Sequence, residues 1–386
     1  MTRLGLYVQV PFCQTKCTYC NFHTGVFSKD LYAPYVHAVC SEIAEFPRLT
    51  AENAIAEVTD AIVDTVYFGG GTPSLLDHAH LAQIIEAIRA AFPSRFEEVT
   101  LEADPETISA EKASAWRDAG FNRISMGVQS FNDAELRPAG RMHRRADIFE
   151  ATKILRATGF ENISFDLIAG LPHQTAASWQ DSVEQLLKLR PEHVSIYLME
   201  IDEGSRLGLE VLQSGERYSA KSLPSDDSMA DYYELGCRQL AAAGYVHYEI
   251  SNWGLPGFES CHNLKYWRRE PYFGFGAGAH SFNGSQRWSN AHDPATYSNA
   301  IHAGCFPVEQ LESVSSGQAL EEELFLGLRQ LAGIDLGAIE AKYATSLQSR
   351  VGELLAQGLV EWDGPRLRLS PERLSVSNEV FVRLLE

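Results

Sequence analysis

The feature that most limits how this 386-residue chain can fold is a regular alternation of short apolar runs with amphipathic stretches. Short apolar runs bounded by turn residues predict strands, and apolar residues repeating every three or four positions predict helices. Strands are expected at residues 4–10, 64–68, 98–103, 123–128, 163–169 and 193–198. Helices are expected between these strands at residues 29–46, 109–119, 146–158 and 175–189. One more helix is expected to begin after an N-cap at Asp77, with its apolar residues on one face: Leu81, Ile84, Ile85, Ile88 and Phe92. Six such strand–helix units predict an α/β fold, a parallel sheet curved into a partial (β/α)6 barrel with ligands at the carboxyl ends of its strands.

The alternation ends near residue 200, which predicts a change of architecture there. We expect a barrel core over residues 1–200, an extension of the barrel over 201–303 with a helix at about 229–243, and a small C-terminal domain over 304–386. Residues 304–318 are expected to form a linker. Helices at 319–331, 337–343 and 346–357, followed by short strands at 359–361 and 367–369, predict a winged-helix-like domain. The absence of excess basic charge there favours a structural or docking role over DNA binding.

The charge balance excludes several classes of partner. The chain carries 32 lysine and arginine residues against 51 aspartate and glutamate residues, a formal net charge of -19. Such a surface repels phosphate backbones, so nucleic acid is not expected as a partner. No apolar run is long enough to span a bilayer, so the chain is not expected to be an integral membrane protein. The N-terminal residues resemble a strand more than a signal peptide, which predicts a cytoplasmic protein whose thiols stay reduced.

Three of the seven cysteines, Cys13, Cys17 and Cys20, follow the first apolar run within eight residues. Thiolates suit iron–sulfur clusters, and a four-iron cluster held by only three cysteines leaves one iron free to bind another group. Two other interpretations remain open at this point. His23 could complete a closed zinc site beside the thiols, and a disulfide is disfavoured by the odd number of cysteines.

The spacing of the three cysteines, with Tyr19 just before the last one, resembles the cluster motif of the radical S-adenosylmethionine (SAM) superfamily. In that superfamily the free iron chelates the amino and carboxylate groups of SAM. The other predicted strand ends carry groups that suit this ligand: a glycine run at 69–71 before Thr72, then Glu102, Gln129, Arg141 and Asp166. Glycine permits close backbone approach, carboxylates suit an ammonium group or hydroxyls, and arginine suits a carboxylate. The sequence therefore predicts that these side chains converge around SAM.

Taken together, these motifs resemble the HemN/HemW family, which comprises oxygen-independent coproporphyrinogen III oxidases and related heme chaperones. The resemblance covers essentially the whole chain. It implies that Cys13, Cys17 and Cys20 hold a 4Fe-4S cluster. The cofactor contacts that it implies near the cluster and SAM are Tyr7, Tyr19, Gly70, Gly71, Thr72, Glu102, Gln129, Arg141 and Asp166. One departure is Gln9, where the family often has histidine, which puts a proton-handling role at that position in doubt.

Two functions compete within this resemblance, an oxidative decarboxylase and a heme carrier. The dehydrogenases have a fourth cysteine where Phe22 stands and a long N-terminal extension, whereas this chain begins twelve residues before Cys13. The stretch His262-Asn263-Leu264-Lys265-Tyr266-Trp267 matches a motif associated with the heme chaperones. The resemblance thus implies a chaperone that binds heme and passes it to acceptor proteins, membrane respiratory enzymes among the candidates, with coproporphyrinogen III dehydrogenase as the alternative. It leaves a homodimer open.

The same motif predicts the heme site. Imidazole is a common axial ligand of heme iron, and aromatic rings pack on a flat porphyrin, so His262 is the predicted ligand, with Tyr266 and Trp267 lining the porphyrin. Cys261 is a competing thiolate ligand and His280 a secondary one. A histidine beside tyrosine and tryptophan is, however, more often a hydrogen-bonded core residue.

Overall fold

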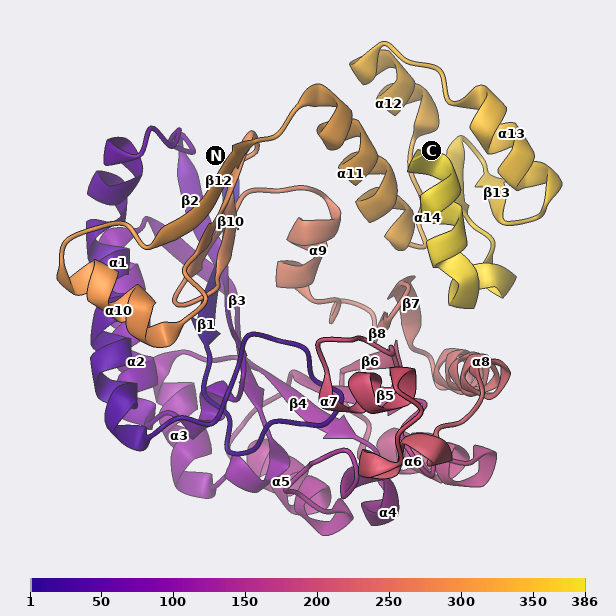
Figure 1. Ribbon diagram of the computed structural model, residues 1–386, viewed down its shortest axis with the longest axis horizontal. Coiled ribbons are helices and arrows are strands. Elements are labelled where there is room, and N and C mark those ends of the chain that lie inside the picture. The colour runs from indigo at the N-terminus through magenta and orange to yellow at the C-terminus, as the bar shows by residue number, and fades with distance from the viewer. Residues whose placement is uncertain (1, 386) are drawn as a thin grey trace.

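The structure, a computed structural model, describes residues 2–385, and its centre is the predicted parallel sheet (Figure 1). The six strands of the alternating region are β1 (Thr2–Val10), β2 (Ala61–Gly70), β3 (Ser94–Ala103), β4 (Arg123–Gln129), β5 (Ile163–Ala169) and β6 (His193–Leu198). They lie side by side in chain order, and each pairs in parallel with the next. The prediction of an α/β fold with an open, partial barrel is confirmed.

Helices cover the outer, convex face of this sheet (Figure 1). They are α1 (Tyr32–Glu52), α2 (His78–Ala91), α3 (Ala110–Ala119), the short α4 (Asp133–Leu136), α5 (Arg145–Ala157) and α6 (Ala176–Leu189). In α2 the predicted apolar face is buried, with Leu81, Ile84, Ile85 and Ile88 each at most 1% exposed. Asp77 occupies the N-cap position of α2, but its side chain makes no capping hydrogen bond.

The sheet continues past residue 200 at both of its edges. Strands β8 (Asn252–Gly254) and β7 (Val246–Glu249) join beyond β6, and β9 (Tyr272–Phe275), β10 (His280–Phe282), β11 (Gln286–Asn290) and β12 (Val308–Ser313) join beyond β1. The result is a twelve-stranded sheet. Of the added strands, β9 pairs in parallel with β1, and the others pair antiparallel with their neighbours.

Strand β12 corrects one prediction. Residues 304–318 were expected to form a linker, but β12 lies within them and pairs with β11 over five residue pairs. Its sequence, Val-Glu-Gln-Leu-Glu-Ser, forms the outermost strand of the sheet, and all but the first residue are exposed. An edge strand that buries almost nothing lacks the apolar alternation by which strands are predicted. The exact boundaries of the three-part division stay a prediction.

Between the barrel and the C-terminal end lie α7 (Arg206–Leu212), α8 (Asp226–Ala242), α9 (Cys261–Trp267) and α10 (Pro294–His302). In Figure 1, α9 stands between the sheet and the C-terminal helices. It contacts the first halves of β1, β2 and β3, through Gly5, Thr65 and Glu98. Helix α9 therefore lies at the amino-terminal end of the barrel, opposite to the end where the parallel strands finish.

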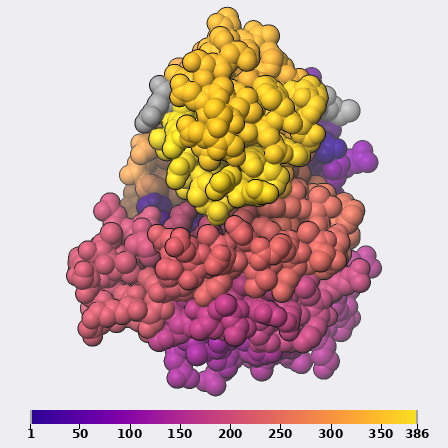
Figure 2. Space-filling view, turned by 90° about the vertical axis from the view of Figure 1, so that its right-hand side faces the viewer, coloured from indigo at the N-terminus to yellow at the C-terminus, as the bar shows by residue number. Residues whose placement is uncertain are grey.

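The C-terminal part contains the predicted helices and hairpin. It comprises α11 (Ser316–Arg329), α12 (Leu336–Tyr343), α13 (Gln348–Ala356), the antiparallel hairpin of β13 (Val360–Asp363) and β14 (Arg366–Leu369), and a further helix, α14 (Ser377–Leu385). Figure 2 shows this part packed on residues of the barrel extension. Within residues 2–385, no helix combines the length and apolar composition needed to cross a bilayer.

Candidate functional site

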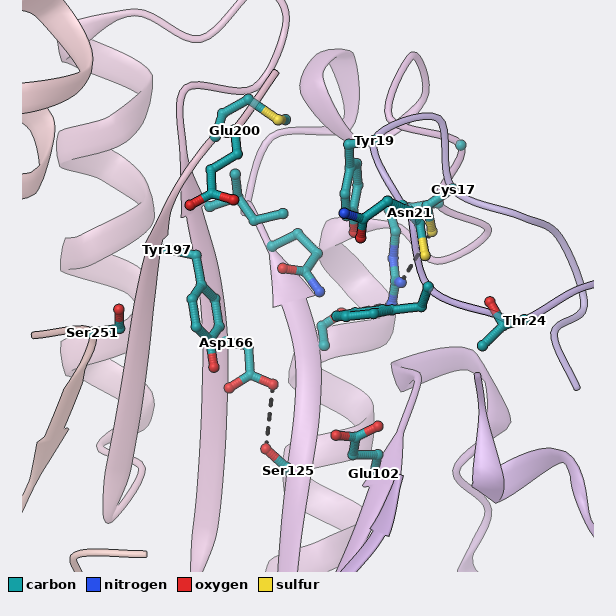
Figure 3. Close-up of a pocket in the computed structure, with 18 of the residues that line it drawn as sticks. Cys17, Tyr19, Asn21, Thr24, Glu102, Ser125, Asp166, Tyr197, Glu200 and Ser251 are labelled. Atoms are coloured by element: carbon teal, nitrogen blue, oxygen red, sulfur yellow. Dashed lines mark hydrogen bonds between the residues drawn. The ribbon is translucent and has the colours of Figure 1, made fainter. Parts of the chain in front are cut away.

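The carboxyl ends of the parallel strands border a cavity of about 570 Å³. In Figure 3, Cys17 and Tyr19 come from the loop after β1, and Tyr197 and Glu200 face them from the end of β6. Part of the wall comes from the C-terminal part of the chain, through Arg329, Leu374, Ser375, Ser377 and Asn378. The cavity is therefore built by segments from the beginning, the middle and the end of the sequence.

Main-chain hydrogen bonds within the cysteine loop, and from it to the segment after α4, hold the loop in place. The Cys13 amide donates to the Gly25 carbonyl at 2.8 Å, and the Thr18 amide donates to the Ala139 carbonyl at 3.0 Å. The Phe12 ring stacks on Tyr32 of α1, with 4.1 Å between ring centroids. These contacts hold Cys13, Cys17 and Cys20, all free thiols, on the cavity wall.

Burial affects the acidity of these thiols. It raises the pKa of Cys13 to about 11 and also raises the pKa of Cys20. Binding of iron therefore has to displace protons from them, as is usual for thiolate ligands. His23, the fourth ligand of the alternative zinc site, stacks its ring on His292 with 4.0 Å between centroids. Within residues 2–385, no three His, Cys, Asp or Glu side chains converge on a point that one metal ion could occupy.

The glycine run after β2 lies directly against the cysteine loop. A Cβ atom on Gly71 would lie 2.5 Å from the Phe12 carbonyl oxygen and 3.0 Å from Cys13 Sγ. Gly70 has φ +109° and faces the Gln9 side chain, which a Cβ atom would meet at 2.4 Å. Only glycine fits such positions without displacing a neighbour. The backbone at the end of β2 therefore reaches the cavity beside the thiols.

The predicted carboxylates both line the cavity, Glu102 from β3 and Asp166 from β5, with β4 between these two strands. Burial raises the pKa of Glu102 to about 7, although the hydrogen bonds from Tyr67 and Gly70 lower it. Burial also raises the pKa of Asp166. Ser125 donates to Asp166 at 3.3 Å (Figure 3). Two enclosed carboxyl groups with raised pKa values favour a positively charged or hydroxyl-bearing ligand over a neutral apolar one.

The side chains of Arg141 and Gln129 both lie next to Gly127. A Cβ atom on Gly127 would lie 3.0 Å from Gln129 Nε2, 3.1 Å from Arg141 Nη2 and 3.3 Å from Asp104 Oδ1. The Arg141 guanidinium forms an ion pair with Asp104 and donates to Cys17 Sγ at 3.5 Å, while its Nε has no partner among the described residues. Gln129 has φ +63° where the β4–β5 register shifts, a strained backbone of the kind found at binding sites.

Three further cavity residues were missed by the sequence analysis. Asp104 binds both Arg141 and Thr72, whose hydroxyl donates to it at 3.1 Å. It stands two residues after Glu102, so the strand-end position alone was a signal for it. Tyr197 and Glu200, at the end of β6, also line the cavity. Tyr197 carries no motif that would have singled it out, and the family's SAM contact near Glu200 is not clearly matched by this sequence.

The predicted heme motif lies at the other end of the barrel. His262 is only 1% exposed. Its Nδ1 is hydrogen-bonded to Thr65 Oγ1 at 3.0 Å and its Nε2 to the Tyr266 hydroxyl at 2.8 Å. Burial lowers the pKa of His262 to about 3, so the ring is neutral. In this arrangement both ring nitrogens are occupied, and a heme iron would have to displace one of these partners.

The neighbours of His262 differ from it in exposure. Cys261 is exposed, and its sulfur makes only a long 3.9 Å contact with the Glu259 carbonyl. Trp267 is partly buried beneath Arg329, whose guanidinium lies 4.5 Å from the centroid of the indole ring. Tyr7, predicted to lie near the cluster, donates its hydroxyl to Gln9 at 2.9 Å inside the barrel.

Known proteins share both the sequence and the architecture. The model of the Radical SAM superfamily matches residues 7–186, and the model of the HemN C-terminal domain matches residues 314–373. Heme chaperone HemW of Bacillus subtilis is 36% identical over 381 residues, which cover 97% of each chain, and that of Lactococcus lactis is 35% identical over 387 residues, which cover 98% of this chain and 96% of the other. The chain belongs to the HemW family of radical SAM proteins.

A solved structure gives the fold independently. Coproporphyrinogen III oxidase (HemN) from Escherichia coli, described as a radical SAM enzyme, matches with a TM-score of 0.83 at 21% identity, covering 99% of this chain and 90% of that one. At this identity the match establishes the fold alone. The chain thus has HemN architecture and HemW-type sequence, so the function has to be argued from residues that can separate the two.

The cavity of this HemW-family chain fits a four-iron cluster with bound SAM. Three free thiols stand at one end, beside a glycine backbone with no room for a side chain. The buried Nε of Arg141 has no hydrogen-bond partner within residues 2–385, and the enclosed carboxyl group of Glu102 also lines the cavity. This donor set offers thiolates for iron, a cation for a carboxylate and carboxylates for an ammonium group.

Proposed function

We propose that this protein is a cytoplasmic heme chaperone, which carries a 4Fe-4S cluster and SAM in the strand-end cavity and transfers heme to acceptor proteins. The observation that carries the proposal is the near full-length similarity to heme chaperones, together with three free cysteines on the wall of that cavity. Acceptor proteins are the expected partners, and a homodimer stays open.

Each cavity residue has a role in this proposal. Cys13, Cys17 and Cys20 hold the cluster, which when bound supplies one iron that is open to the amino and carboxylate groups of SAM. Arg141 stabilises the SAM carboxylate, and Glu102 its ammonium group. The remaining contacts are assigned to other residues of the cavity wall, namely Tyr19, Gly70, Gly71, Thr72, Gln129 and Asp166. Tyr7, which lies inside the barrel and does not line the cavity, is assigned a place near the cluster.

The heme site is proposed at the α9 motif, with His262 as iron ligand and Tyr266 and Trp267 against the porphyrin. His262 is hydrogen-bonded to Thr65 through Nδ1 and to Tyr266 through Nε2, so ligation requires the iron to displace one of these two partners. Cys261, on the exposed surface of the same helix, is the competing ligand.

A heme titration of purified, anaerobically reconstituted protein tests this proposal. The wild-type protein is expected to bind about one heme per chain and to transfer it to an apo-acceptor. The informative variants are His262→Phe, which removes both ring nitrogens but keeps an aromatic ring, and Cys261→Ala. We expect loss of the heme spectrum in the first and not in the second. The reverse result would assign the iron to Cys261, and no binding by the wild-type protein would end the chaperone proposal.

The HemN-like architecture makes coproporphyrinogen III dehydrogenase the second candidate. Phe22 stands at the position of the fourth cysteine in the dehydrogenase motif. Its side chain lines the cavity and is 66% exposed. We expect no conversion of coproporphyrinogen III to protoporphyrinogen IX with SAM and a reductant. Product analysis under anaerobic conditions decides between the two, and robust multiple turnover would favour the enzyme.

A further inference from the structure

A row of rings connects the two ends of the barrel. The His262 ring stacks on Tyr67 with 5.3 Å between centroids, and Tyr67 stacks on Tyr7 at 6.0 Å. The Tyr67 hydroxyl donates to Glu102 Oε1 at 2.8 Å. One tyrosine therefore contacts both the α9 motif at the amino-terminal end and the carboxyl group at the cavity end.

The His262 end of this row is held rigidly. Glu98 accepts the main-chain amides of Cys261 and His262, each at 3.0 Å, and so fixes the first turn of α9 on β3. Lys265 Nζ lies 2.8 Å from Asp64 Oδ1, and both side chains are almost fully buried. Because α9 is fastened by these contacts, the His262 ring has one position against Tyr67.

The Glu102 end depends on few contacts. Its Oε1 accepts from Tyr67, and its Oε2 accepts from the Gly70 amide at 3.1 Å. Without the tyrosine hydroxyl, a single hydrogen bond would remain to fix the carboxyl group, and rotation about the side-chain torsions would no longer be restrained.

We propose that Tyr67 is a positioning residue for the Glu102 carboxyl group, and that the His262 ring determines where Tyr67 stands. The inference rests on the proposed role of Glu102 as a contact of the SAM ammonium group. It assigns to the α9 motif a function at the SAM site, which is independent of whether His262 also binds heme iron. Helix α9 thereby contributes to a site at the opposite end of the barrel.

The first test is SAM affinity, measured by isothermal titration of the anaerobically reconstituted protein. Tyr67→Phe removes one oxygen atom and keeps the ring. Loss of a hydrogen bond to a charged group is expected to weaken SAM binding about tenfold to a hundredfold, with unchanged iron and sulfide content.

The chain offers a matched control. Tyr297 donates its hydroxyl to Glu42 at 2.6 Å, and burial raises the pKa of Glu42 to about 7, as it does for Glu102. This pair lies on α10 and α1, and neither residue lines the cavity. Tyr297→Phe removes the same kind of hydrogen bond and is expected to leave SAM affinity unchanged. An equal loss of affinity in both variants would mean that destabilisation, and not positioning, is the cause.

The pH dependence of SAM binding gives a readout that a purely structural role would not move. The Tyr67 hydrogen bond lowers the pKa of Glu102, so its removal is expected to shift the pH midpoint of binding upward. The other groups around Glu102 are the Gly70 amide and the side chains of Asp104, Asp166, Tyr7, Tyr197 and Tyr266. Tyr67→Phe leaves all of them in place.

The second part of the proposal is tested with two changes at His262. His262→Phe keeps a ring against Tyr67 and is expected to retain SAM affinity, whereas His262→Ala leaves Tyr67 unsupported and is expected to weaken it. Equal SAM affinity in both variants would overturn the coupling, and wild-type affinity in Tyr67→Phe would overturn the positioning role. A wild-type protein that binds the cluster but no SAM would instead refute the proposed function.

Discussion

Both ends of the barrel enclose polar side chains, but the two ends differ in how these side chains are hydrogen-bonded and paired. At the amino-terminal end, His262 and the charged groups that fasten α9 to the sheet bind one another. His262 has a partner on each nitrogen, Lys265 pairs with Asp64, and Glu98 accepts the first amides of the helix. Paired groups of this kind fix one arrangement of the chain, and the proposed heme iron would have to displace one of the partners of His262.

At the carboxyl-terminal end the polar groups keep free capacity. Burial raises the pKa values of Glu102 and Asp166, the Arg141 Nε has no partner among the described residues, and Gln129 is strained. Such unsatisfied and perturbed groups are typical of a binding site. The comparison teaches that burial alone does not mark function, because the decisive difference is whether the buried groups satisfy one another.

The largest expected effect concerns the carboxyl-terminal end. Replacing Cys13, Cys17 or Cys20 with alanine is expected to abolish the 4Fe-4S cluster, since a four-iron cluster bound by three thiolates cannot lose one of them. Iron and sulfide analysis after anaerobic reconstitution measures the loss.

The remaining cysteines provide the control. Replacing Cys40, Cys237 or Cys305 is expected to leave the cluster intact, because these residues lack metal-site spacing. One bound zinc without stoichiometric iron and sulfide in the wild-type protein would contradict this prediction and favour the zinc alternative.

The second prediction concerns the amino-terminal end. Lys265→Met leaves the Asp64 carboxyl buried without its close partner, and Arg3 at 3.5 Å on the surface can replace it only in part. The free energy of unfolding is expected to fall by about 3 kcal/mol, at the low end of the cost of breaking a buried ion pair. Urea denaturation followed by circular dichroism measures it.

Lys342→Met, which breaks the pair with Glu323 on the surface of the C-terminal part, is the matched control. Its cost is expected to stay below about 1 kcal/mol, because exposed pairs contribute little. Equal costs for the two variants would contradict the claim that the α9 end is organised for stability.

The third prediction is a pH dependence at the cavity end. Glu102 must be ionised to stabilise an ammonium group, and its pKa is raised to about 7, so a large fraction is protonated below that pH. SAM affinity is therefore expected to rise with pH, by up to about tenfold per unit below the pKa, and to level off above it. Glu102→Gln is expected to bind SAM weakly at every pH. A flat wild-type profile would show that the carboxyl group does not contact the ammonium group.

The arrangement of the carboxyl-terminal end of the barrel could be predicted from the sequence better than that of the amino-terminal end. The six parallel strands and the strand-end residues follow from local signals, because apolar runs report burial and parallel strands bring their carboxyl ends together. The position of His262 could not be predicted, since it depends on α9 packing against β2 and β3 more than 160 residues earlier in the chain. Tyr67 gave no signal either, because one tyrosine in an apolar strand looks like any other core residue. Strand β12 was missed because its exposed, polar sequence carries no periodicity.

The smallest expected effect lies where the amino-terminal end of the barrel meets the C-terminal part. Trp267 is packed beneath Arg329, which also pairs with the fully buried Glu249 at 3.2 Å, and the Trp267 Nε1 donates to no partner among the described residues. Trp267→Phe therefore removes no hydrogen bond found within residues 2–385 and only weakens the contact between the Arg329 guanidinium and the aromatic ring. The free energy of unfolding is expected to fall by about 1 kcal/mol. Arg329 also lines the cavity, but it keeps its pair with Glu249 in this variant, and the Tyr67 row begins at His262, at the opposite end of α9, so SAM affinity and cluster content are expected to stay unchanged. Urea denaturation and SAM titration of the same samples check both parts. A fall in SAM affinity comparable to that of His262→Ala would mean that the whole helix, and not its first turn alone, supports the cavity end.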